Sequence, residues 1–149
     1  MVVASLCLLT ACAKKDAHDH AASGAHVHTA PHGGTLIELG EHAYSLELVR
    51  DAAEGKLTAY VLDGHAENFV RIKASSFDVI ATVGGEKRPL TLKAVANTAT
   101  GETVGDTSQF ETQADWLKTT ETFDAVFPRL DLRGNAFANI AFNFPKGNR

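Results

Sequence analysis

Short segments in which apolar and polar residues alternate dominate this chain from about residue 35 onward. In the segment AYSLELV, Tyr44, Leu46 and Leu48 fall on one side. Ser45 and Glu47 fall on the other side. This period of two is typical of a half-buried antiparallel strand, because successive side chains of a strand point to opposite faces. No stretch of twelve or more residues carries the apolar stripe of period 3.6 that a long helix requires, so the chain is restricted to short strands.

Further segments extend this pattern along the chain. Residues 56–62, KLTAYVL, are apolar on both faces and predict a central strand. Two hairpins are predicted, one turning at Gly84-Gly85 and one at Gly134-Asn135. Between them, residues 98–122 predict one or two short edge strands and a helical turn around Asp115. Some eight short strands at this spacing predict an all-β fold, an Ig-like antiparallel β-sandwich, with an open barrel as the alternative.

The N-terminal residues have the character of a targeting segment. Residues 2–11, VVASLCLLTA, form an uncharged apolar run that fits a signal-peptide core and is too short to span a bilayer as a helix. The junction Leu9-Thr10-Ala11-Cys12 resembles the lipobox of bacterial lipoproteins. The resemblance implies removal of residues 1–11 and lipid attachment at Cys12, hence an envelope protein that faces the periplasm. The same resemblance implies, from Ala13 after the cysteine, the outer membrane over the inner one. An ordinary secretory signal or a buried N-terminal strand are the alternatives.

The residues after Cys12 predict a flexible connection to the domain. Residues 12–31 are rich in Ala, His and small polar residues and show no apolar periodicity. Such a composition predicts a disordered tether. The expected organisation is therefore a signal peptide at 1–11, a lipid-anchored tether at 12–31 and a β-domain at 32–149.

Histidine is distributed very unevenly. All seven histidines lie within the first 65 residues: His18, His20, His26, His28, His32, His42 and His65. Four of them form two His-x-His pairs, in which an extended chain presents both imidazoles on the same side. Neutral imidazole suits Zn(II), Cu(II), Ni(II) and Co(II), and the mature chain would offer no free thiol or thioether. The pattern predicts binding of Zn(II) or Cu(II); a solvated low-complexity spacer is the alternative.

Two of these histidines belong to the predicted domain. His42 opens the strand that holds Tyr44, and His65 follows the strand at 56–62. If the first three strands are neighbours, His32, His42 and His65 gather at one end of the sheet and form a preorganised metal site. The alternative is that His42 and His65 are ordinary exposed loop residues.

One block of sequence resembles a known family. It consists of His32-Gly33-Gly34, the strand LIELG at 36–40, SLEL at 45–48 and LTAYVLD at 57–63. The block is similar to the His-rich N-terminal segment of periplasmic adaptor subunits of RND-type heavy-metal efflux systems. The resemblance covers residues 26–63 and implies an envelope location and the handling of divalent metals, with His32 on the shared motif. The chain is too short to hold the remaining domains of such an adaptor.

Charge and motifs exclude other classes of function. A net charge of −4 with scattered basic residues argues against a nucleic-acid partner. The chain contains no G-x-S-x-G or H-E-x-x-H motif, and we expect no enzymatic activity. The leading hypothesis is an envelope lipoprotein, anchored to a membrane, that buffers Zn(II) or Cu(II) or passes the ion to an efflux complex. The alternative is a non-catalytic interaction module of the envelope in which the His-rich tract is only a tether.

Overall fold

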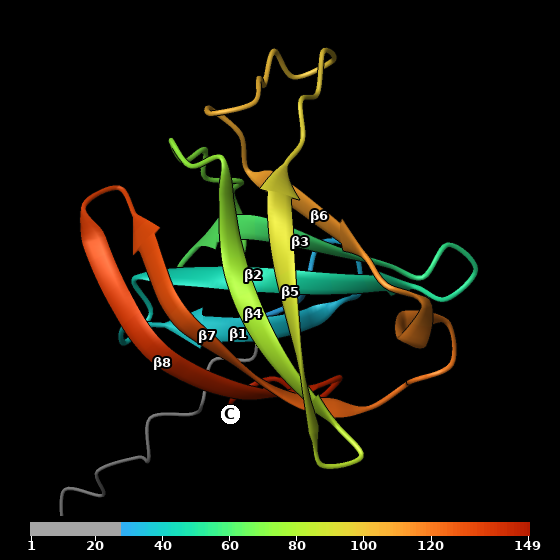
Figure 1. Ribbon diagram of the computed structural model, residues 1–149. Coiled ribbons are helices and arrows are strands. Elements are labelled where there is room, and N and C mark those ends of the chain that lie inside the picture. Colours follow the sequence, from blue (N-terminus) through green and yellow to red (C-terminus); the bar gives the residue numbers. More distant parts are fainter. Residues whose placement is uncertain (1–27) are drawn as a thin grey trace, which may run out of the picture.

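The computed structural model describes residues 28–149, which form one antiparallel sheet of eight strands (Figure 1). The strands and one 3-10 helix follow the chain in this order: β1 (Thr35–Leu39), β2 (Tyr44–Asp51), β3 (Lys56–Asp63), β4 (Ser76–Val83), β5 (Glu86–Ala94), β6 (Gln109–Gln113), η1 (Asp115–Lys118), β7 (Phe123–Leu132) and β8 (Asn135–Phe144). In space the strands are ordered β1-β2-β3-β6-β5-β4-β7-β8. The all-β antiparallel class predicted from the sequence is confirmed.

The sheet curls until its two edge strands come close to each other. In Figure 1, β1, β2 and β3 cross behind β4 and β5, while β7 and β8 curve around one side. The two halves of this single sheet face each other across the core, as the two layers of a sandwich do, and the shape is that of an open barrel. The C-terminal residues bridge the seam, because the Asn148 side chain exchanges two hydrogen bonds of 2.9 Å with the backbone of Glu38 on β1.

Both predicted hairpins are present. Gly84 and Gly85, with φ of 58° and 86°, form the two-residue turn between β4 and β5. The second turn lies at Arg133-Gly134, one residue before the predicted Gly134-Asn135, because Asn135 already pairs with Leu132. Both turns use left-handed backbone at their two central residues, which matches the twist of the strands that they join.

The segment at 98–122 differs from its prediction. Its strand, β6, pairs with β3 on one side and β5 on the other, so it is an interior strand and not an edge strand. The predicted helical turn is confirmed as η1, and Leu117 is fully buried. The segment has few apolar residues, so its sequence did not indicate which strands it pairs with. The pairing depends on β3 and β5, which lie on either side of it.

Aromatic rings fill the centre of the barrel. The Phe127 ring stacks on Phe142 at 5.0 Å between centroids and meets Phe77 edge-on at 5.9 Å. Phe77 in turn packs on Phe110 at 4.7 Å. These rings come from β4, β6, β7 and β8, so one cluster joins both halves of the sheet.

The outward face of β2 is also buried. Ser45 and Glu47 point away from the apolar core, yet they are only 2% and 0% exposed. The predicted half-buried strand is therefore buried on both faces. At Glu47 the cover comes from residues 32–34, because the amides of His32 and Gly34 donate to its carboxylate.

No helix within residues 28–149 has the length and apolar character needed to cross a membrane.

Candidate functional site

Strand register brings His42 and His65 to the same end of the sheet. Tyr44, the first residue of β2, is the register partner of Asp63, the last residue of β3. His42 lies two residues before Tyr44, and His65 lies two residues after Asp63. The turn between β1 and β2 therefore lies beside the loop that follows β3.

The turn that carries His42 has an uncommon backbone. Gly40, Glu41 and His42 follow one another with φ of 56°, 46° and 68°. Residues other than glycine seldom adopt this left-handed region, and each costs roughly 1 kcal/mol or more. The amide of Ala43 stabilises the turn by donating to the carbonyl oxygens of Leu39 and Gly40 at 3.1 and 2.9 Å. Backbone strain of this kind is often concentrated at functional sites.

A carboxylate organises the loop that carries His65. Burial alone raises the pKa of Asp63, but hydrogen bonds from the Asn68 side chain and from the amides of Glu67, Asn68 and His65 outweigh it and leave the pKa below its usual value. The Asn68 bond measures 2.6 Å and the Glu67 bond 2.9 Å. The loop is therefore held by its own ionised side chain, which fixes the point where His65 leaves the sheet.

His28 completes a group of three imidazoles. Its ring centroid lies 5.7 Å from that of His42 and 5.7 Å from that of His65, with interplanar angles of 71° and 84°. The Nε2 atom of His28 is buried and has no hydrogen-bond partner among residues 28–149. We call His28, His42 and His65 the histidine cluster.

Glu38 and Arg149 border the histidine cluster. Nδ1 of His42 pairs with Glu38 Oε1, and the guanidinium of Arg149 pairs with the other oxygen of Glu38. Nη2 of Arg149 also lies 3.3 Å from His42 Nδ1. A carboxylate can only accept and a guanidinium can only donate, so Nδ1 of His42 faces an acceptor and a donor together.

The three imidazoles lie close together, but their ring nitrogens do not converge on one position for a metal ion. Among residues 28–149, no three His, Cys, Asp or Glu side chains stand in the positions of metal ligands. A cavity of about 360 Å³ adjoins the cluster and is lined by His28, Glu38, Lys146 and Arg149, among others. The cluster therefore has space beside it in which side chains can turn.

His32 makes its contacts elsewhere, although it was expected beside His42 and His65. Its Nδ1 lies 2.8 Å from Oε2 of the buried Glu47, and its ring stacks on Tyr60 at 4.0 Å between centroids. Phe69, which is 49% exposed, packs against both rings. His28 instead takes the third position of the cluster. Of the other predicted site residues, His18, His20, His26 and Cys12 lie outside the described part of the chain.

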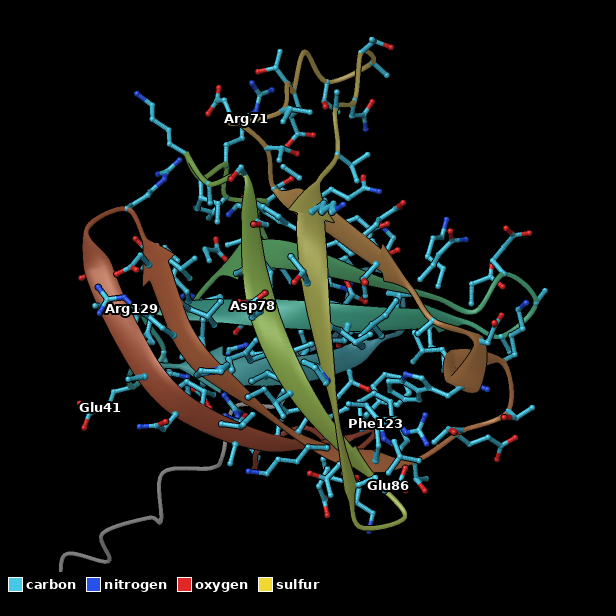
Figure 2. The ribbon with its side chains drawn as sticks, viewed as in Figure 1. Glu41, Arg71, Asp78, Glu86, Phe123 and Arg129 are labelled. Carbon is cyan, nitrogen blue, oxygen red and sulfur yellow. The ribbon has the colours of Figure 1, made fainter. Side chains whose placement is uncertain are left out.

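A second buried carboxylate, Glu102, stabilises the loop between β5 and β6. One of its oxygens accepts from the amide and the hydroxyl of Ser108 at 2.8 and 2.6 Å, and the other accepts from the Thr100 hydroxyl at 2.6 Å. Burial raises the pKa of Glu102, but these hydrogen bonds and the charge of Arg71 outweigh it and lower the pKa below its usual value. The loop that Glu102 stabilises is separate from the histidine cluster, because Arg71 lies far from Glu41, the neighbour of His42 (Figure 2). Sequence reasoning missed Glu102, Glu38 and Glu47, because an acidic residue carries no signal of burial.

Glu102→Ala is expected to lower the free energy of unfolding by about 1–3 kcal/mol at pH 7, because the buried Ser108 amide loses its acceptor. A depressed pKa contributes stability above the pKa of the unfolded group and loses it as the pH falls through the folded value. The difference between wild type and variant should therefore shrink below about pH 4.3, the value of a free glutamate. Urea unfolding at pH 7, 5 and 3.5 measures it, and a difference independent of pH would contradict the prediction.

Comparisons with models of protein families, with curated proteins and with solved structures find no significant match to this chain.

Proposed function

We propose that this protein binds a divalent transition metal, Zn(II) or Cu(II), through His28, His42 and His65. The observation that carries the proposal is the grouping of three imidazoles from three separate segments, in which the ring centroid of His28 lies 5.7 Å from that of His42 and 5.7 Å from that of His65. Three imidazoles with one further position, open to water or to another ligand, form a common zinc site in proteins.

The ring separations support coordination after small side-chain rotations. With a metal–nitrogen bond of about 2.0 Å, two imidazoles on one tetrahedral ion have centroids roughly 5 Å apart. The separations of 5.7 Å are close to this value. The steep angles between the rings also agree, since ligands that converge on one ion do not stack.

The neighbouring carboxylate supports the same proposal. Histidines that bind metals usually donate the proton of their second ring nitrogen to a carboxylate or a carbonyl oxygen, which fixes the tautomer and orients the ring. The Glu38 carboxylate lies against Nδ1 of His42, in the place that such an acceptor occupies. In the bound form His42 would bind the ion through Nε2, and His28 would use its unpartnered Nε2.

The choice of metal follows from the ligand atoms. Both cysteines and the single methionine occur at or before position 12, so the cluster offers nitrogen and carboxylate oxygen only. Imidazole nitrogen favours Zn(II) and Cu(II), whereas Cu(I) prefers sulfur. His18, His20 and His26 are further candidate ligands in the preceding tract.

In this proposal the protein acts in the bacterial envelope. Lipid attachment at Cys12 would anchor it to a membrane, facing the periplasm, and the tract would capture ions and pass them to the histidine cluster. The resemblance of residues 26–63 to efflux adaptor segments supports delivery to an efflux complex.

Titration of the metal-free protein with Zn(II) and with Cu(II) at pH 7.5 tests the proposal. We expect the H28A, H42A and H65A variants each to weaken binding at the tightest site by about tenfold or more, since even the loss of a group that orients a ligand has an effect of 10–100-fold. The H18A/H20A/H26A variant is the matched control, in which the same number of imidazoles is removed from the tract and the tightest site is retained.

Two results would overturn the proposal. One is a wild-type protein that takes up neither metal, and the other is an affinity unchanged in the triple cluster variant H28A/H42A/H65A. Either result would favour the alternative, an interaction module whose histidines are not ligands.

A further inference from the structure

A buried carboxylate holds the point where the N-terminal segment meets the sheet. Glu47 on β2 is fully buried, and it accepts three hydrogen bonds, all from residues 32–34. Oε1 accepts from the amides of His32 and Gly34 at 2.8 and 2.9 Å, and Oε2 accepts from His32 Nδ1 at 2.8 Å. Both carboxylate oxygens are therefore committed to one short stretch of chain.

The two glycines after His32 permit this close approach. Gly33 has a φ of 68°, which glycine adopts without steric cost, and its amide donates to Ala30 at 3.0 Å to close a turn. At Gly34 a Cβ atom would lie 2.5 Å from the carbonyl oxygen of Leu48 and 2.9 Å from the Glu47 side chain. The His-Gly-Gly sequence thus places the chain directly against β2.

The anchor and the histidine cluster share the same two strands. Glu47 is the register partner of Tyr60, on which His32 stacks, and the pair Tyr44 and Asp63 lies three positions further along. Three positions of a strand span roughly 10 Å. The four residues from His32 back to His28 reach at most about 14 Å. When the chain is fixed at His32, the four residues back to His28 are therefore just long enough to place His28 at the cluster.

We infer that Glu47 is a positioning residue for the metal site, which holds His32 and Gly34 and thereby delivers His28 to His42 and His65. The inference rests on the proposed function and deepens it, because it makes one of the three ligands conditional on a carboxylate that does not touch the metal. With the anchor in place, the chain around His28 is ordered during folding, so metal binding does not bear that entropic cost.

The test compares Zn(II) affinity and the Cu(II) electron paramagnetic resonance spectrum in the wild type, E47A, H28A and E47A/H28A. We expect E47A to weaken Zn(II) binding by 10–100-fold, the range for groups that orient ligands. The double variant should bind no more weakly than H28A, because both changes remove the same ligand. The Cu(II) spectrum should change from three coupled nitrogens to two in E47A.

A matched control separates positioning from general loss of stability. Glu102 is also a buried carboxylate with three hydrogen-bonded donors, and its partners belong to the loop between β5 and β6. E102A should be destabilised and yet keep wild-type affinity. E47Q should restore affinity to within a few-fold of wild type, because the amide oxygen still accepts from both backbone amides and its NH2 group can donate to Nδ1 of His32. If E47A does not fold, E47D, whose carboxylate is one methylene shorter, replaces it.

The outcomes distinguish the two proposals. If the wild type binds metal and depends on His28, but E47A or E47D binds equally well with three coupled nitrogens, the role of Glu47 is wrong and the metal site stands. If the wild type binds no metal, both are wrong. Hydrogen exchange of the metal-free protein gives an independent reading, because E47A should raise exchange at the amides of residues 32–34, and protection equal to wild type would overturn the anchor.

Discussion

Phe127→Ala is expected to lower the free energy of unfolding by about 3–5 kcal/mol, the usual cost of removing a fully buried phenylalanine side chain. Phe127 is 0% exposed and lies between the rings of Phe77 and Phe142. Because these rings belong to β4, β7 and β8, the cavity would open where the curled sheet meets across the core. Urea unfolding followed by Trp116 fluorescence measures the change.

Phe69→Ala is the control for this substitution. It removes a ring of the same size that is 49% exposed, and it should cost about 1 kcal/mol, the value of an aromatic pair contact. Equal losses in the two variants would mean that the stacked rings in the barrel are not the main source of stability.

The second large effect is expected from Gly64→Ala. A Cβ atom at Gly64 would lie 1.7 Å from the carbonyl oxygen of His42 and 2.7 Å from its carbonyl carbon. Both atoms belong to the backbone, so the turn after β1 and the loop after β3 must separate. We expect a loss of about 3 kcal/mol or more in stability, at the upper end of overpacking effects. The proposed Zn(II) affinity should fall as well, because these two segments carry His42 and His65.

Gly84→Ala provides the comparison at a glycine without neighbours. Its φ of 58° makes alanine unfavourable by about 1–2 kcal/mol, but no atom of the described residues 28–149 lies within 4 Å of the added Cβ. Its Zn(II) affinity should equal that of the wild type. Thermal unfolding and zinc titration of both variants give the answer, and a Gly64→Ala protein as stable as Gly84→Ala would show that the two segments are not in close contact.

The histidine cluster was predictable in part. The sequence placed His42 and His65 beside the ends of neighbouring strands, and an antiparallel arrangement of those strands brings their flanks together. His28 was among the predicted ligands, but His32 was expected beside His42 and His65. Both residues precede β1, and spacing alone does not tell which of them reaches the cluster. Glu47 decides this by binding His32 and Gly34 and thus fixing the chain four residues after His28.

By itself the sequence determined the strands, because alternation of apolar residues and glycine turns are local properties that each segment carries with it. It also determined where the imidazoles are concentrated. Only the tertiary structure decided that β6 lies between β3 and β5, that Ser45 and Glu47 are buried, and that the sheet curls into one barrel. These features depend on contacts between segments that are far apart in the chain. The free energy of such a contact depends on both segments, so the sequence of one segment does not predict it.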